Sequence, residues 1–183
     1  MKNSIKVLFL IFFIFSYNLF SQESFPKSWE GNYQGELQIF DVDSVKMKVI
    51  MKLTIAKKTA SVYQWKITYN FRGKEDIRDY ELRMIDSTKG HYIIDERNTI
   101  EIDSYYKMQT FTSFFEVMNS YIISTYTKNN NDDILFEIIA ASTNKPSIAG
   151  NSKHKGEEIP EVKSYFINGR QRAILMKLSL TPN

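Results

Sequence analysis

The fold is decided by a stretch that reads VKMKVIMKLTIAKKTASVYQWKITYNF at residues 45–71. Apolar side chains recur at every second position over 45–55 and again over 63–71, with mostly polar side chains between them. A period of two places neighbouring side chains on opposite faces of a β-strand, whereas a helix requires a period of 3.6 residues. The stretch therefore predicts two long antiparallel strands, each with one buried face, joined by a short turn near 57–59.

The same alternation continues on both sides of this stretch. Upstream it covers residues 29–39, and downstream short polar breaks separate further apolar runs. The downstream runs expected to face the core alternate within 80–84, 92–94, 100–102, 111–117, 121–123, 134–138 and 174–180. Closing the sheet removes the unpaired edges that this many strands would otherwise expose. We therefore expect an all-β chain that forms an antiparallel up-and-down β-barrel of roughly 8–10 strands.

Residues 143–163 interrupt the pattern. They hold Pro146, Gly150, Gly156 and Pro160 among mixed charges, with little alternation of apolar side chains. Connections of this length are uncommon inside a domain and are usually functional or mobile. We expect a long mobile loop here, within a single domain that spans residues 22–183.

The N-terminus has the pattern of an export signal. Lys2 and Lys6 flank the start of a wholly apolar segment at 7–15, which is too short to span a bilayer as a helix. Ser21 is the small residue that signal peptidase requires before the cut. We expect residues 1–21 to be a signal peptide, and the mature protein to be periplasmic or secreted, from a Gram-negative bacterium. The alternative is an uncleaved N-terminal anchor.

The composition argues against several classes of function. The chain of 183 residues has no cysteine, which removes disulfides, thiolate metal sites and a cysteine nucleophile. Loss of Lys2 and Lys6 with the signal peptide lowers the formal net charge from +3 to +1, so we expect no nucleic-acid partner. Lys46, Lys48 and Lys52 lie on the strand face that would meet lipid in a membrane-spanning barrel. We expect no membrane span in the mature form.

The sequence WEGNYQG at residues 29–35 resembles the opening strand of lipocalin-like, or calycin, proteins. Members of that superfamily are up-and-down barrels that hold small apolar ligands. The resemblance implies that Trp29 closes one end of the barrel, with Gly31 and Gly35 allowing close backbone approach. It also implies that Arg170 or Arg172 packs on the Trp29 ring. Lipocalins proper carry Gly-x-Trp, whereas this chain has Trp-x-Gly.

Catalytic motifs are sparse in this sequence. The two histidines, His91 and His154, are not accompanied by a Gly-x-Ser-x-Gly elbow, and the metal-binding and phosphate-binding motifs are missing. Asp95 and Glu96 are adjacent in a predicted strand, so they point to opposite faces and cannot act as a pair; Glu96 has the inward parity. We expect a protein that is not an enzyme, with no cofactor and no metal.

Large inward-facing side chains predict the wall of a cavity. Five of them supply large apolar area, and the three tyrosines among them add hydroxyl groups that can orient a ligand: Trp65, Tyr69, Tyr80, Tyr92 and Phe115. Arg78 shares their parity, and an inward charge needs a carboxylate, water or a ligand as partner. We expect Arg78 to hold the anionic head of a small amphipathic ligand such as a fatty acid. The alternative is that Arg78, at a solvated strand end, extends outward into solvent and pairs with Glu96.

Two functions fit these observations. The first is an exported, soluble β-barrel that binds a small amphipathic or hydrophobic ligand. The second is a structural or interaction module of the cell envelope with a filled core and no ligand. They differ in whether the barrel encloses a cavity, since a small barrel either fills with side chains or leaves room for one ligand.

We predict that the mature protein begins at Gln22, because the length of the apolar segment and Ser21 together place the cut there. N-terminal sequencing of exported protein should read Gln-Glu-Ser-Phe. Exported material that still begins at Met1 would contradict this prediction.

Overall fold

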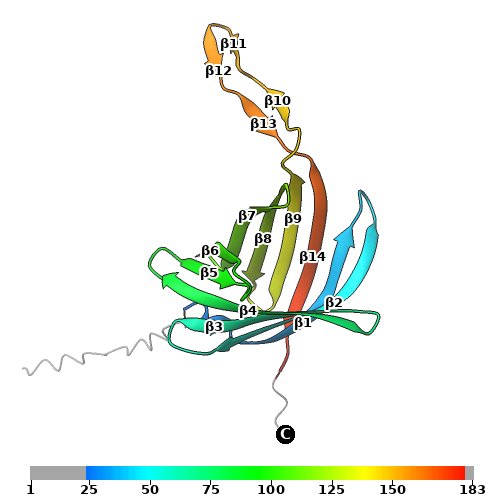
Figure 1. The fold of residues 1–183 in the computed structure, drawn as a ribbon, viewed down its shortest axis with the longest axis vertical. Coiled ribbons are helices and arrows are strands. Elements are labelled where there is room, and N and C mark those ends of the chain that lie inside the picture. The colour runs from blue at the N-terminus through cyan, green and yellow to red at the C-terminus, as the bar shows by residue number, and fades with distance from the viewer. Residues whose placement is uncertain (1–23, 180–183) are drawn as a thin grey trace, which may run out of the picture.

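The alternating stretch at 45–71 forms two adjacent strands, β2 (Val45–Lys57) and β3 (Val62–Phe71), which pair antiparallel over their shared length. In the computed structural model, which describes residues 24–179, ten strands follow the neighbour order of an up-and-down meander and close into a barrel (Figure 1). The predicted fold class is therefore confirmed. The predicted signal peptide at 1–21 lies outside the described residues.

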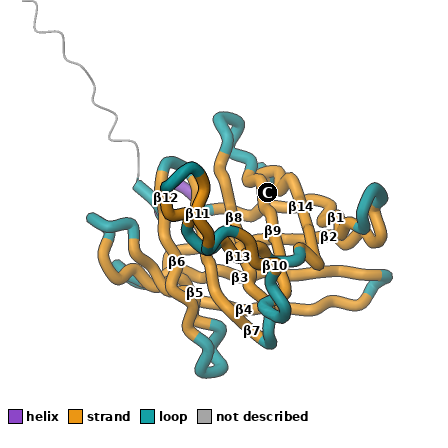
Figure 2. The backbone as a smooth tube through the Cα atoms, turned by 90° about the horizontal axis from the view of Figure 1, so that it is seen from above, coloured by secondary structure: helices purple, strands orange, loops and turns teal. Residues whose placement is uncertain are grey.

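The other eight barrel strands are β1 (Gly31–Phe40), β4 (Lys74–Asp86), β5 (His91–Asp95), β6 (Glu101–Lys107), β7 (Thr110–Val117), β8 (Ser120–Lys128), β9 (Ile134–Ser142) and β14 (Ile167–Lys177). A single turn of 3₁₀ helix, η1 (Lys27–Trp29), precedes β1. Seen from above, most of the described backbone is strand, with loops and turns in teal around it and the helical turn in purple at one side (Figure 2).

The barrel closes where the first strand meets the last. β1 and β14 pair antiparallel, from Tyr33 opposite Lys177 to Ile39 opposite Gln171. Gly35 lies in the middle of this seam, and a Cβ atom added there would stand 2.0 Å from the carbonyl oxygen of Ile174. Only glycine allows the two backbones to approach this closely, which gives Gly35 a steric role in closure.

Aromatic side chains fill one end of the barrel. The Phe25 ring stacks on the Tyr106 ring with centroids 4.4 Å apart, and meets the rings of Trp29 and Tyr92 edge-on at 5.0 Å. Trp29 is fully buried. The Tyr33 hydroxyl donates to the Trp29 carbonyl at 2.8 Å and fixes the turn that carries it. This closed end is therefore built by the segment that precedes the first strand.

The cations expected over Trp29 lie elsewhere. The Arg170 guanidinium stands over the Phe40 ring, and both Arg170 and Arg172 pair with Glu137, towards the opposite end of β14. The expected contact with the Trp29 ring is wrong because Arg170 and Arg172 lie on the exposed outer face of β14, whereas Trp29 is buried inside the barrel. A cation found at the closed end is Lys128, whose Nζ donates to the Ser28 carbonyl at 2.6 Å.

Two runs face the opposite way from the prediction. In β8 the inward side chains include Ser124 and Tyr126, whereas Tyr121 and Ile123 point out. In β14 the buried side chains are Ala173 and Leu175, while Ile174 and Met176 are 52% and 60% exposed. Apolar residues occupy both faces of these strands, so register with neighbouring strands, rather than hydrophobicity, decides which face is inside.

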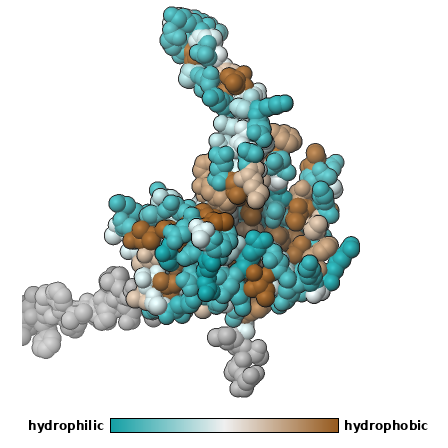
Figure 3. All heavy atoms as spheres, viewed as in Figure 1, coloured by the Kyte–Doolittle hydropathy of each residue, from teal (hydrophilic) through white to brown (hydrophobic). Residues whose placement is uncertain are grey.

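Residues 143–163 form a projecting β-hairpin arm rather than an irregular loop (Figure 1). Its base pairs β10 (Ser147–Ala149) with β13 (Val162–Ser164), and its tip pairs β11 (Ser152–His154) with β12 (Glu157–Ile159). The Tyr165 ring meets the Tyr121 ring edge-on at 5.2 Å where the arm leaves the barrel. Figure 3 shows hydrophobic surface gathered on the barrel below the arm and a mostly hydrophilic tip. The mobility of the arm stays a prediction.

Replacement of Trp29 with alanine should lower the free energy of unfolding by about 3–5 kcal/mol, since a large buried ring is removed from a packed cluster. Denaturant titration of both proteins measures this change. Phe114→Ala, which removes a ring that is 63% exposed on the outer face, is the control and should cost much less. Equal losses in the two variants would contradict the packing role of Trp29.

Limited trypsin digestion of the folded protein should first cut the arm, at Lys145, Lys153 or Lys155. These lysines lie in exposed turns or short strands that pair only across the hairpin, where local opening costs little. Mass spectrometry of the first fragments identifies the cut. A first cut within 45–71 would show that the long β2–β3 hairpin opens more easily than the arm.

Candidate ligand cavity

A cavity of about 200 Å³ lies inside the barrel, in the half farther from Trp29, and is open towards that end. Seven consecutive strands, β3 to β9, contribute inward side chains to its wall. The lining residues are Trp65, Ile67, Tyr69, Arg78, Tyr80, Ile94, Glu96, Ile102, Phe111, Ser113, Phe115, Ile122, Ser124, Tyr126, Phe136 and Ile138. The wall is thus mainly aromatic and aliphatic, with a few polar groups that converge on it, as is typical of small-molecule sites.

Five of the six residues predicted from the sequence lie together in this wall: Trp65, Tyr69, Arg78, Tyr80 and Phe115. Tyr92 does not join them. It faces inward as expected, but it lies opposite Met84 near the closed end, and its hydroxyl donates to the Phe25 carbonyl at 3.2 Å. The period of two sets which face a side chain occupies but not its depth in the barrel, so Tyr92 belongs to the closed end.

A layer of rings forms the floor of the cavity. The Trp65 ring contacts the Phe111 ring at 5.3 Å and meets the Tyr126 ring edge-on at 5.1 Å. Phe111 also contacts Phe25 at 5.1 Å, so it joins the floor to the closed end. Offset and edge-on rings of this kind pack without voids. The space above the floor exists because small side chains, including Ser113 and Ser124, face it from β7 and β8.

Arg78 lies at the mouth of the cavity, and its environment differs from the prediction. Its side chain is 49% exposed, and its Nε and Nη2 atoms donate to the Asp76 carboxylate at 3.2 and 3.0 Å. Its Nη1 atom donates to the Tyr80 hydroxyl at 3.3 Å. The side chain thus extends into solvent, as in the alternative expectation, but its partner is Asp76, two residues away on the same face, and not Glu96. Arg78 is therefore half in solvent and already paired, so it needs no anionic ligand to offset burial.

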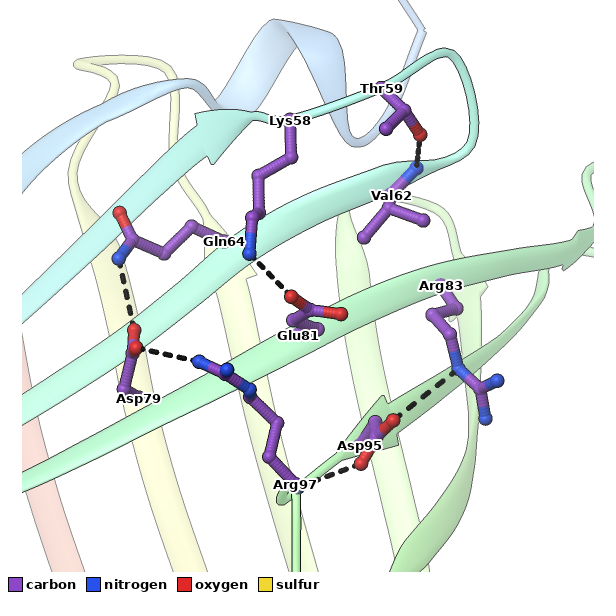
Figure 4. Close-up of polar contacts among 9 residues, drawn as sticks. All are labelled: Lys58, Thr59, Val62, Gln64, Asp79, Glu81, Arg83, Asp95 and Arg97. Atoms are coloured by element: carbon purple, nitrogen blue, oxygen red, sulfur yellow. Dashed lines mark hydrogen bonds and ion pairs between the residues drawn. The ribbon is translucent and has the colours of Figure 1, made fainter.

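Glu96 lines the cavity, and its two chain neighbours form polar contacts that Figure 4 shows, Asp95 with Arg83 and Arg97 with Asp79. The Arg97 guanidinium donates to Asp79 at 3.0 Å, and the Arg97 backbone N–H donates to the Asp95 carboxylate at 2.7 Å. The Glu96 backbone N–H donates to the Ile100 carbonyl at 3.0 Å and closes the turn. Exposed pairs like these add little stability, but together they hold the Glu96 backbone so that its side chain points inward.

The tyrosine hydroxyls of the wall stay protonated at neutral pH. Burial raises the pKa of Tyr69 to about 12, partly offset by Arg78. Burial also raises the pKa of Tyr126 well above its ordinary value, and the pKa of Tyr80 is raised by burial and by the Glu96 carboxylate. Each hydroxyl is therefore available as a hydrogen-bond donor to a bound molecule.

A wider groove of about 520 Å³ lies at the open end and meets the cavity. Tyr69, Arg78 and Ile138 line both spaces. The remaining groove residues come mainly from the rims of β1, β2 and β4: Leu37, Ile39, Met47, Val49, Phe71, Lys74, Asp76 and Gln171. The cavity thus reaches solvent at the end of the barrel opposite Trp29.

Sequence reasoning missed several residues of the wall. Glu96 has the inward parity that the sequence shows, but nothing in the sequence marks it as part of a cavity. Ser124 and Tyr126 were not identified, because the sequence pattern placed the other face of β8 inside the barrel. Ser113 is buried and its hydroxyl bonds the Ser104 hydroxyl at 2.7 Å, a pairing between β6 and β7 that only the register reveals.

Other features of the described part bear on the class of site. Residues 24–179 contain no group of three or more histidine, aspartate or glutamate side chains placed to hold a metal ion. Helical structure in that range is too short to cross a membrane. The sequence matches no protein-family model, and no curated protein is similar to it at a significant level.

Proposed function

We propose that this protein is a binding protein, rather than an enzyme, that holds a small amphipathic molecule inside an exported barrel. The observation that carries the proposal is the cavity above the Trp65–Phe111 floor, which joins apolar rings to polar groups and meets a groove at the open end. A barrel that served only as a structural module would gain stability by filling this space with side chains.

The cavity volume limits the ligand. A dry cavity of about 150 Å³ accommodates benzene. A space of about 200 Å³ therefore accepts one ring with a short side chain, or part of a longer molecule whose remainder lies in the groove. A fatty acid, the ligand class expected from the sequence, fits only in this second way, with its chain extending past Tyr69 and Arg78 into the groove.

The architecture agrees with the lipocalin-like resemblance. An up-and-down barrel closed at one end beside Trp29 is the form that the resemblance implies, although it has ten strands where lipocalins have eight. We propose a place in that broad superfamily on this architecture and on the WEGNYQG stretch. The location outside the cytoplasm belongs to the same proposal and rests on the N-terminal export pattern.

A neutral fluorophore tests the proposal directly. Titration with 1-aminoanthracene, whose three fused rings would reach from the cavity into the groove, should give a saturable rise in fluorescence with one site per chain, because the rings leave water for an apolar wall. Ser124→Phe, which fills the cavity from β8, should weaken binding at least tenfold. Thr125→Phe adds the same ring on the outer face of the same strand and should bind as the unaltered protein does.

Circular dichroism of both variants verifies that they fold. A linear, non-saturable response of the unaltered protein, or equal binding by both variants, would favour the structural module with a filled core.

A further inference from the structure

The charges around the cavity do not balance once their partners are counted. Among the described residues, the charged side chains that line the cavity are Arg78 and Glu96. Arg78 is neutralised by the Asp76 carboxylate, which it contacts through two nitrogen atoms. Glu96 forms no ion pair within residues 24–179; its Oε2 atom accepts from the neutral Asn98 amide at 3.3 Å, and its carboxylate also interacts with the neutral Tyr80 hydroxyl. The cavity wall therefore carries one carboxylate without a cationic partner.

The surroundings of Glu96 favour a cation. Seven aromatic residues share the cavity wall with it: Trp65, Tyr69, Tyr80, Phe111, Phe115, Tyr126 and Phe136. The faces of such rings attract an ammonium group through their negative potential, and the attraction grows when water is excluded. A carboxylate beside aromatic rings thus offers an ammonium group both a charge-assisted hydrogen bond and cation–π contacts.

An anionic head is disfavoured by the same arrangement. It would have to compete with Asp76 for the Arg78 guanidinium, and inside the cavity it would meet the Glu96 carboxylate. The groove carries one net positive charge, from Lys74 and Arg78 against Asp76, and this charge lies outside the cavity at its mouth. Inside the cavity, Glu96 and the Arg78–Asp76 pair together leave one net negative charge.

We propose that the cavity is selective for a short amine: a primary ammonium group at Glu96, attached to one ring or an apolar body of similar size that lies on the Trp65–Phe111 floor. This proposal rests on the proposed ligand-binding function and narrows it to one chemical class. Glu96 is the specificity-determining residue, and the aromatic wall supplies the remaining contact area.

The experiment compares three ligands with the same phenyl body and different heads: 2-phenylethylamine, 2-phenylethanol and 3-phenylpropionate. Each is titrated against the protein loaded with 1-aminoanthracene at neutral pH, and its affinity is obtained from displacement. The amine should bind at least tenfold more tightly than the alcohol, and the carboxylate should bind most weakly.

The variant Glu96→Gln keeps the shape and hydrogen-bonding capacity of the side chain but removes its charge. It should weaken the amine about tenfold, equivalent to about 1.4 kcal/mol, and leave the alcohol unchanged. Glu75→Gln removes one negative charge from the outward face of β4 and should change neither affinity, which controls for the overall charge of the protein.

Equal binding of amine and alcohol, tighter binding of the carboxylate, or an unchanged amine affinity in Glu96→Gln would overturn the amine proposal while the fluorophore still reports a binding cavity. Failure of the fluorophore itself to bind would instead overturn the ligand-binding function, and the amine proposal with it.

Discussion

The contact between β1 and β14 is the constraint on which the rest of the structure depends. Ten antiparallel strands enclose an interior only if the first meets the last, and the meeting point has no room for a side chain because a Cβ on Gly35 would reach 2.0 Å from the Ile174 carbonyl oxygen. Once closed, the number of strands fixes the width of the barrel. What the barrel can do then depends on which side chains fill that width.

The interior is divided into two parts with different contents. At one end the segment before β1 inserts Phe25 and Trp29 among rings from β5, β6 and β7, and these buried side chains pack against one another. Above the Trp65–Phe111 floor, serines on β7 and β8 face rings on β3 and β4, and a cavity results. The filled core and the ligand cavity, which the sequence presents as alternatives, thus describe two halves of one barrel.

The sequence predicts strands well where the two faces differ in chemistry. In β2 and β3 lysines and other polar residues occupy one face, so parity identifies the inward residues without ambiguity. In β8 and β14 both faces carry apolar side chains, and the inward ones include the small residues Ser124 and Ala173; only pairing with neighbouring strands sets the register.

The alternation of side chains predicts neither how deep a residue lies along the barrel axis nor which partner a charge has. Tyr92 therefore lies deeper than expected and Arg78 has another partner, whereas Trp65, Tyr69 and Phe115 lie as predicted. The central claim, that the barrel is hollow above its aromatic floor, is tested most directly by a crystal structure of the protein under xenon pressure, since xenon binds against apolar side chains that line a cavity. The account predicts a xenon peak between Trp65, Phe115 and Tyr126, and none around Trp29. Side chains that occupy this space, with no xenon inside the barrel, would contradict it.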